Sequence, residues 1–260
     1  MIRLAQIWRY PLKSVGRERL SRAHLITGGK LPFDRHWAIL HEGSLKRLDK
    51  AGEPPQWLPK VAFLRGAAAP GLQAVSGGLD NGRLVLRHPE QGDIAVDPGN
   101  TEDTDRLIGW LRPLWPDDKP VPVKLIAGQE PLTDTRKPFI SINSLDSLRV
   151  LEAHAGQRLG VERWRGNLWI EGAEPFTELD WIGREISIGA IRMIVREAIG
   201  RCSATAVDVD TGQPDLDMVR TLTEAYGHSH FGVYAEVLEG GDITEMDTVI
   251  PDDQPLEGSV

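Results

Sequence analysis

The segment GRCSATAVDVDTG (Gly200–Gly212) holds the only cysteine of this 260-residue chain, Cys202. Apolar runs lie on both sides of it, at Ile191–Val195 and Ala204–Val209, and they predict two strands joined by a glycine-containing turn. A lone cysteine is usually a small buried hydrophobe. This one lies at a turn and follows Arg201, whose charge would favour the thiolate, the form that binds metals. Cys202 is therefore both a candidate ligand and a candidate core residue.

Short apolar runs with a period of two dominate the rest of the chain, and clusters of Gly, Pro, Asn and Asp separate them. Apolar residues at helical spacing, preceded by capping residues, predict helices at Asp105–Leu111, Ser144–Ala155 and Asp215–Tyr226. Many short strands with few helices predict an α+β fold that is predominantly β, with barrel or sandwich lobes and a few peripheral helices. The further predicted strands are Arg3–Tyr10, Arg22–Ile26, His36–His41, Ala62–Arg65, Arg83–Arg87, Asp93–Val96, Val121–Ile126, Asn167–Glu171, Glu185–Ile188 and Gly232–Leu238.

The pattern breaks near residues 113–122, PLWPDDKPVP, where prolines and aspartates interrupt it. This break predicts a first domain over residues 1–118 and a second over residues 119–252, followed by a tail over residues 253–260. The last ten residues, PDDQPLEGSV, are polar and we expect them to fray.

Composition and charge exclude several classes of protein. The chain is 40% hydrophobic and 26% charged, with a net charge of −8, which argues against a nucleic-acid partner. The start lacks the apolar core of a signal peptide, and no run approaches the 18 apolar residues of a membrane span, so no membrane association is expected. One cysteine cannot form an internal disulfide, which favours a reducing compartment. We therefore expect a cytoplasmic protein.

Common catalytic motifs are missing from the sequence. There is no GxxxxGK[ST], GxGxxG, HExxH or GxSxG pattern. The DVDTG segment (208–212) resembles the start of a calcium loop, but Gln213 and Val219 occupy the positions that need Gly and Glu, so a turn is the better interpretation. His228 and His230 lack a CxxC or a third histidine nearby, and we interpret them as loop residues.

Cations and small polar residues gather where predicted strands meet turns. Lys13 and Ser14 follow the first strand, Asp34 and Arg35 precede the strand at His36, and Arg163, Arg165 and Asn167 enter another strand. Each could be an ordinary solvated strand end. Together they offer a point charge, guanidinium forks, a hydroxyl and an amide, which are the donors that a phosphate attached to a heteroaromatic ring needs.

These segments together resemble the MOSC family, named after the C-terminal domain of molybdenum cofactor sulfurases. The resemblance runs from about residue 2 to residue 250 and would include an N-terminal β-barrel domain before the MOSC domain. The matching order comprises YPLKS (10–14), GGKLPFDRHWAIL (28–40), ISINSLDSL (140–148), RWRGNLWIEGAEPFTELDW (163–181), GRCSATAVDVDTG (200–212) and FGVYAEVLEGGDITEMD (231–247). The chain departs from the family pattern at Met246, where the family has Gly.

The resemblance implies a cofactor site. In the branch that includes the mitochondrial amidoxime-reducing component, a cysteine at the position of Cys202 ligates molybdenum, and Arg201 matches the arginine of the family's RC pair. Ser144, with Ser141 and Asn143, falls in the segment that closes over the cofactor. The residues implied to hold the pterin and its phosphate are Lys13, Ser14, Arg35, Arg165 and Asn167.

The resemblance also implies a reaction, the two-electron reduction of N-hydroxylated compounds such as hydroxylamines and amidoximes. One cysteine cannot hold an iron–sulfur cluster that needs four, so electrons would come from a separate ferredoxin-like or cytochrome b5-like protein or a flavin reductase. The chain is too short for an aminotransferase-like domain, so pyridoxal phosphate is not expected. Two alternatives remain: a non-catalytic carrier or sulfur-transfer module for molybdenum cofactor, and a cofactor-free interaction module in which Cys202 is structural.

Overall fold

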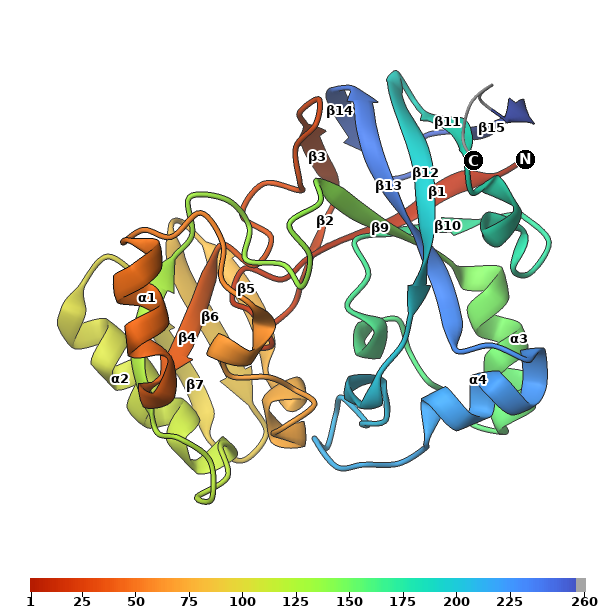
Figure 1. The fold of residues 1–260 in the computed structure, drawn as a ribbon. Coiled ribbons are helices and arrows are strands. Elements are labelled where there is room, and N and C mark those ends of the chain that lie inside the picture. Colours follow the sequence, from red (N-terminus) through yellow and green to blue (C-terminus); the bar gives the residue numbers. More distant parts are fainter. Residues whose placement is uncertain (256–260) are drawn as a thin grey trace.

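The computed structural model describes residues 1–255, which form two lobes side by side (Figure 1). The small-sheet lobe contains helices α1 (Leu45–Ala51) and α2 (Thr101–Leu111) and strands β4 (Trp37–His41), β5 (Ser76–Asp80), β6 (Arg83–His88), β7 (Gly92–Val96) and β8 (Pro122–Ala127). The large-sheet lobe contains helices α3 (Leu145–Ala155) and α4 (Met218–Tyr226). Its strands are β1 (Arg3–Arg9), β2 (Glu18–Leu20), β3 (Arg22–Leu25), β9 (Phe139–Ser144), β10 (Leu168–Glu171), β11 (Arg184–Ile188), β12 (Ile191–Gly200), β13 (His230–Glu239), β14 (Gly241–Thr244) and β15 (Val249–Pro255).

An eight-stranded sheet, in the order β15-β11-β12-β13-β9-β10-β1-β2, forms the centre of the large-sheet lobe. Strands β9 and β10 run parallel, and the other neighbouring strands run antiparallel. Because β1 pairs with β10, with Leu4 opposite Ile170, the first strand of the chain is part of the sheet formed by its C-terminal half. Alternate apolar side chains, including Leu4, Ile142 and Val233, are buried together in one core.

The small-sheet lobe has its own core. Strands β5, β6 and β7 form one antiparallel sheet, and β4 pairs with β8, with Ile39 opposite Leu125. Helix α2 packs over β7 and β8. Leu107 and Leu111 of the helix and Val96 of β7 are fully buried in one cluster. Strand β8 thus belongs to this lobe, although it follows the proline-rich break in the sequence.

The β-rich α+β fold expected from the sequence is confirmed. The three predicted helices are present as α2, α3 and α4, each with a polar N-cap side chain that accepts a backbone hydrogen bond: Asn100, Ser144 and Asp217. Helices α3 and α4 are followed by glycines in the left-handed conformation, Gly156 and Gly227.

Two predicted strands are wrong. Within Ala204–Val209, Ser203–Thr205 forms a 3-10 helix (η7), and Val207 makes only a single bridge to Pro214. Within Ala62–Arg65, a 3-10 helix (η2, Lys60–Ala62) is followed by one bridge from Phe63. In both places the larger apolar residues, such as Val207 and Phe63, are buried, but most of the backbone forms local turns rather than a ladder.

The sequence pattern also does not predict α1, β2, β5, β9, β14 and β15. Strand β15 extends over residues 251–255, where fraying was expected, because it pairs with β11, with Pro251 opposite Ile186. Residues 256–260 of the predicted tail lie outside the described residues. Within residues 1–255, no helix has the length and apolar character needed to cross a membrane.

Candidate functional site

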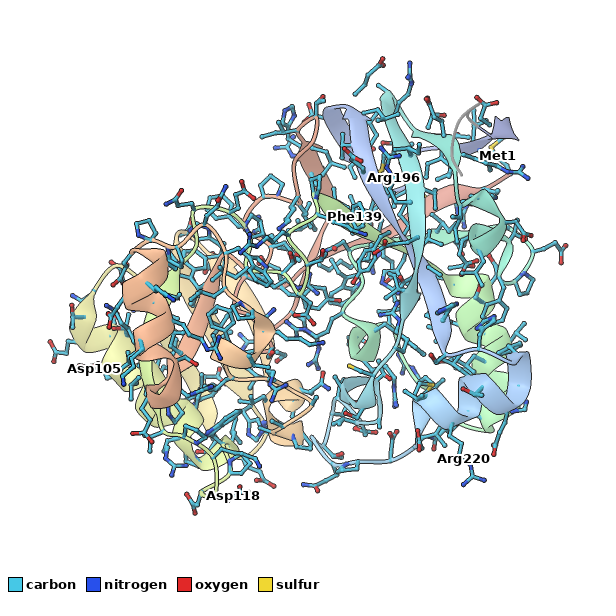
Figure 2. All side chains as sticks on the ribbon, in the orientation of Figure 1. Met1, Asp105, Asp118, Phe139, Arg196 and Arg220 are labelled. Atoms are coloured by element: carbon cyan, nitrogen blue, oxygen red, sulfur yellow. The ribbon has the colours of Figure 1, made fainter. Side chains whose placement is uncertain are left out.

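A cavity of about 380 Å³ lies between the lobes, a size typical of small-molecule sites. Figure 2 places Phe139, one of its lining residues, near the junction of the lobes, whereas Asp105 and Arg220 lie at the outer edges. Seven basic and two acidic residues line the cavity, although the chain as a whole has a net charge of −8. Such a concentration of positive charge favours an anionic ligand. These residues are Lys13, Arg35, Lys60, Arg65, Arg163, Arg165 and Arg201, with Asp34 and Asp134.

Cys202 lies on the wall of this cavity, at the start of the loop that follows β12, and it is exposed. The backbone amide and the hydroxyl of Thr205 both donate to the Cys202 carbonyl, at 3.0 and 2.9 Å, and hold the loop in a tight turn. Arg163 also holds this loop in place. It donates to the Thr205 carbonyl at 3.1 Å and forms an ion pair with Asp215 at 2.7 Å. The cysteine thus stands on a fixed loop.

Arg201 anchors the loop to the core. Its guanidinium donates to the carbonyls of Trp164 (3.0 Å) and Phe231 (2.9 Å), and it lies over the Trp164 ring with 5.3 Å to the centroid. Burial lowers the pKa of Arg201 to about 10, so it remains protonated at pH 7. The residue next to Cys202 in the chain is therefore a buried cation.

Two more guanidinium groups share the ring of Tyr10, which is fully buried. Arg35 lies 4.6 Å and Arg165 lies 4.3 Å from its centroid, and Arg35 also donates to the Arg165 carbonyl at 2.7 Å. Arg35 is paired with Asp34, whereas Arg165 bonds to backbone carbonyls of Leu12 and Gly16. Burial, and then the charge of Arg35, lowers the pKa of Arg165 to about 9. The cluster is electrostatically costly, and a bound anion would offset that cost.

Lys13 occupies another part of the wall. Its side chain is buried, and its Nζ donates to the Leu132 carbonyl at 2.8 Å and to Asp134 at 2.6 Å. Burial lowers the pKa of Lys13 in spite of this contact. Burial opposes the ionisation of Asp134, but the charge and hydrogen bond of Lys13, with the charges of Lys60 and Arg35, together outweigh it and lower the Asp134 pKa.

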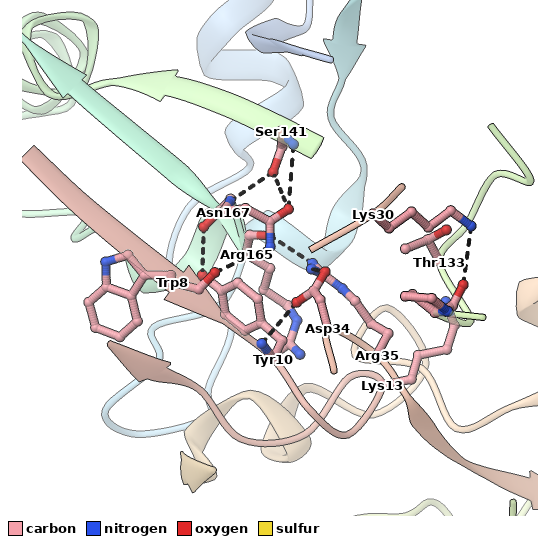
Figure 3. Close-up of polar contacts among 12 residues, drawn as sticks. Trp8, Tyr10, Lys13, Lys30, Asp34, Arg35, Thr133, Ser141, Arg165 and Asn167 are labelled. Atoms are coloured by element: carbon pink, nitrogen blue, oxygen red, sulfur yellow. Dashed lines mark hydrogen bonds and ion pairs between the residues drawn. The ribbon is translucent and has the colours of Figure 1, made fainter. Parts of the chain in front are cut away.

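Neutral hydrogen-bonding groups complete the wall. Ser141 on β9 and Asn167 bond reciprocally: the Ser141 hydroxyl donates to Asn167 Oδ1 at 2.9 Å, and the backbone N–H of Asn167 donates to Ser141 Oγ at 2.8 Å (Figure 3). Asn167 Nδ2 donates one hydrogen to the Trp8 carbonyl at 3.3 Å, which leaves its second amide hydrogen for a ligand. The Ser14 hydroxyl makes no hydrogen bond with any residue in the described range 1–255.

The structure brings seven of the eight predicted site residues to this one cavity: Lys13, Ser14, Arg35, Arg165, Asn167, Arg201 and Cys202. Ser144 is not among the lining residues, because it is fully buried and caps α3. Of its neighbours, Ser141 lines the cavity and Asn143 does not. The lining residues that sequence reasoning missed include Lys60, Arg65, Gln73, Asp134 and Tyr234. Signals existed for Tyr234, an aromatic residue in a predicted strand, and for Arg65, a cation at the end of the predicted strand Ala62–Arg65.

The other sequence motifs lie outside the cavity. The DVDTG segment is a turn, in which Asp208 Oδ1 accepts from the amides of Asp210 (2.8 Å) and Thr211 (2.9 Å). His228 and His230 are stacked with their centroids 5.3 Å apart. Within the part of the chain that the structure describes, no group of three or more His, Cys, Asp or Glu side chains is placed to hold a metal ion.

The donor set fits an anionic, metal-bearing organic cofactor. Cys202 offers one soft sulfur ligand, the guanidinium groups around Tyr10 offer forked donors for a phosphate, and Ser14 and Asn167 offer neutral donors. Because a single thiol cannot complete a metal site, the remaining ligands would have to come from the cofactor itself.

Comparisons with known proteins identify the family. The MOSC domain matches residues 132–250, and the MOSC N-terminal beta barrel domain matches residues 1–110. The chain belongs to the MOSC-domain proteins that carry an N-terminal MOSC beta barrel domain. This membership supports a function associated with molybdenum cofactor.

Curated relatives agree with this family. Molybdenum cofactor sulfurase 1 of Aedes aegypti is 32% identical over 278 residues, covering 89% of this chain and 33% of the relative. Molybdenum cofactor sulfurase 3 of the same mosquito is 23% identical over 273 residues, with the same coverage of both chains. Molybdenum cofactor sulfurase of Anopheles gambiae is 36% identical over 75 residues, 28% of this chain and 10% of the relative. The chain spans a third or less of the length of these relatives.

Solved structures show more distant similarity. The YUAD protein from Bacillus subtilis covers 98% of both chains at 12% identity, with a TM-score of 0.46. YiiM from Geobacillus stearothermophilus covers 44% of this chain and 54% of its own at 18% identity, with a TM-score of 0.35.

Proposed function

We propose that this chain holds the molybdenum–pterin cofactor in the cavity between its lobes, with Cys202 as the protein ligand of molybdenum. The observation that carries this proposal is the exposed Cys202 thiol on the wall of a cavity lined by seven basic and two acidic residues. Thiolate is a soft ligand suited to molybdenum, and clustered guanidinium and ammonium groups are the usual partners of phosphate.

The surrounding residues would divide the work of binding. Arg35 and Arg165, stacked on Tyr10, would hold the phosphate with forked donors, and Lys13 would add a point charge once it is released from Asp134. The hydroxyl of Ser14 and the free amide hydrogen of Asn167 would orient the pterin ring. Arg201 would supply positive charge behind the thiolate.

The reaction that we propose is the reduction of N-hydroxylated compounds, hydroxylamines and amidoximes. Each N–O bond that is reduced consumes two electrons and two protons and yields the N–H compound and water. When bound, the cofactor supplies the two-electron redox chemistry, while the protein binds and orients the reactants and supplies an electrostatic field around them. The electrons come from a separate ferredoxin-like or cytochrome b5-like protein or a flavin reductase, because one cysteine cannot hold a four-cysteine cluster. The cytoplasm would keep Cys202 as a free thiol.

Measurement of bound molybdenum by inductively coupled plasma mass spectrometry tests the ligand assignment. We expect near-stoichiometric metal in the wild type from a cofactor-competent host and almost none in Cys202→Ala. Ser203→Ala is the matched control, since Ser203 is the exposed neighbour of Cys202 and does not line the cavity. Folded wild-type protein without molybdenum or pterin would contradict the proposal.

A second candidate is a non-catalytic carrier or sulfur-transfer module for the cofactor. The observation that favours it is that the curated relatives are molybdenum cofactor sulfurases. Reduction of benzamidoxime by molybdenum-loaded protein with reduced methyl viologen separates the two candidates. Turnover supports the reductase, whereas loaded protein that reduces neither amidoximes nor hydroxylamines supports the carrier.

A further inference from the structure

Arg65 differs from the other basic residues that line the cavity. Its side chain makes no hydrogen bond or ion pair with any residue in the described range 1–255. Each of the other six contacts an acidic side chain or a backbone carbonyl: Lys13, Arg35, Lys60, Arg163, Arg165 and Arg201. Arg65 is half-buried, so its charge has lost part of its hydration without gaining a protein acceptor. Its guanidinium is therefore available to an anion from outside the chain.

The backbone at Arg65 is held firmly. The amides of Ala68 and Ala69 both donate to the Arg65 carbonyl at 3.0 Å, and the preceding residue, Leu64, donates to the carbonyl of Ile39 on β4 at 3.0 Å. The guanidinium therefore extends from a fixed point on the small-sheet lobe, as a binding residue should.

The wall that carries Arg65 is bonded to the loop of Cys202. A Cβ atom at Gly66 would lie only 3.1 Å from the side chain of Gln73, so these two residues are in close contact. Gln73 Nε2 in turn donates to the carbonyl of Ala204, two residues after Cys202. The segment of Arg65 and Gly66 is thus linked to the loop of Cys202 through Gln73, which contacts Gly66 and bonds to Ala204.

Arg65 is bonded differently from the cations assigned to the cofactor. Arg35 and Arg165 share the Tyr10 ring, and they are the groups assigned above to the phosphate of the cofactor. Within residues 1–255, Arg65 makes no hydrogen bond, ion pair or ring contact with that cluster, and it lies on the other lobe from Cys202. A guanidinium fork binds two-oxygen anions such as carboxylate and phosphate with paired hydrogen bonds.

We propose that Arg65 anchors an anionic group of the substrate, so that the preferred N-hydroxylated compound carries a carboxylate or a phosphate as well as its N–O bond. This inference rests on the proposed function, because it assumes that the cysteine side of the cavity receives the substrate. Arg65 is then the residue that determines specificity for charge.

Binding without a reductant tests the inference independently of turnover. Isothermal titration calorimetry on molybdenum-loaded protein would compare benzamidoxime, 4-carboxybenzamidoxime and 4-phosphonobenzamidoxime. We expect one or both anionic probes to bind about tenfold more tightly than the neutral one, the size expected of one charge-assisted contact in a partly solvated site. A preference for the carboxylate or the phosphonate identifies which anion the site takes.

Variants assign the preference to Arg65. Arg65→Gln should bring the three dissociation constants together, and Arg65→Lys should keep part of the preference. Arg47→Gln should keep all of it, because Arg47 is an exposed arginine of α1 outside the cavity. Equal binding of all probes to the wild type would overturn the inference. So would uniform weakening, or loss of molybdenum, in Arg65→Gln, since either means that Arg65 supports the fold or the cofactor.

The same titrations separate this inference from the proposed function. If the anionic probes bind through Arg65 but reduced methyl viologen drives no reduction of any of them, the anion-binding role of Arg65 is supported and the reductase function is contradicted. If all three probes are reduced with equal kcat/KM and bind equally, the reductase stands and the anion site fails.

Discussion

Three residues around the cavity hold backbone conformations that side-chain-bearing residues rarely adopt. Ser14 has a φ of 65°, and Arg35 and Arg165 both have a φ of 49°. The left-handed region costs an L-residue about 1–2 kcal/mol. Glycine would avoid that cost but would remove the hydroxyl and both guanidinium groups. Strain of this kind concentrates at functional sites, so the backbone supports the assignment of these residues independently of their charge.

Glu178 is a buried carboxyl group whose stability contribution depends on pH. It is fully buried in the 3-10 helix η6 (Thr177–Trp181), and both of its oxygens lie 3.0 Å from the Ser147 hydroxyl. Burial raises its pKa from 4.5 to about 7. Between these two values the folded protein keeps a proton that the unfolded chain has released, so the free energy of unfolding falls as pH rises toward 7.

Glu178→Gln should remove this pH dependence. The amide has the same shape and no charge, so we expect the variant to gain up to about 3 kcal/mol over the wild type between pH 5 and pH 8. Urea denaturation at several pH values measures the difference. Glu224→Gln is the control, because Glu224 is exposed on α4 and should leave the wild-type slope unchanged. A wild-type slope in Glu178→Gln would contradict the prediction.

At the scale of single elements, Ser144 joins β9 to α3. Its hydroxyl accepts hydrogen bonds from the amides of Asp146 and Ser147, both at 3.2 Å, as an N-cap does. Ser144→Ala should therefore lower the free energy of unfolding by about 1 kcal/mol and leave the molybdenum content unchanged. Urea denaturation and metal analysis measure the two effects. Ser144→Thr should retain the cap. Loss of molybdenum in Ser144→Ala would instead assign the hydroxyl to the cofactor, as the family resemblance implies.

Period-two patterns predicted some strands correctly and misassigned others for physical reasons. In β9, Ile140 and Ile142 alternate with Ser141 and Asn143 as in an ordinary strand. The polar residues there looked like a helix start, because only tertiary contacts reveal that Ser141 bonds to Asn167. After Cys202 the pattern also alternates, but Thr205 closes a local turn that its residue type does not signal. The alternation of apolar and polar residues therefore cannot show whether a backbone group bonds to a neighbouring strand or within its own turn.

Some residues of the candidate site could likewise be predicted from the sequence, and others could not. Cations next to strand ends could be identified from the sequence, because together they offer the donor types that a phosphate on a heteroaromatic ring needs. Asp134 could not, since it lies in an irregular segment, and Arg65 ended the predicted strand Ala62–Arg65 but was not selected as a site residue. Their place in the cavity depends on how the lobes meet. One such contact is Gly212, where an added Cβ would lie 2.9 Å from the Cα atom of Gly71.

At the scale of the whole molecule, the cavity concentrates cations from distant parts of an acidic chain. Residues 1–50 contain 11 Lys and Arg against 4 Asp and Glu, whereas residues 201–260 contain 2 against 13. The fold places Lys13 and Arg35 from the basic end beside Arg165 and Arg201. Arg17 further ties the lobes together by donating to the carbonyls of Val75 (3.0 Å) and Val209 (3.4 Å). An anion in the cavity would therefore stabilise both lobes at once.

Inorganic phosphate should raise the Tm of cofactor-free protein for this reason. A ligand at about 100 times its Kd stabilises the folded state by about 2.7 kcal/mol, which corresponds to about 5–10 °C for a chain of this size. Differential scanning calorimetry measures the shift, with chloride at equal ionic strength as the salt control. Arg165→Gln should lose most of the rise, whereas Arg196→Gln, on the exposed face of β12, should keep it. An equal rise with chloride would mean that the cavity does not select phosphate, and a full rise in Arg165→Gln would mean that phosphate does not bind at Arg165.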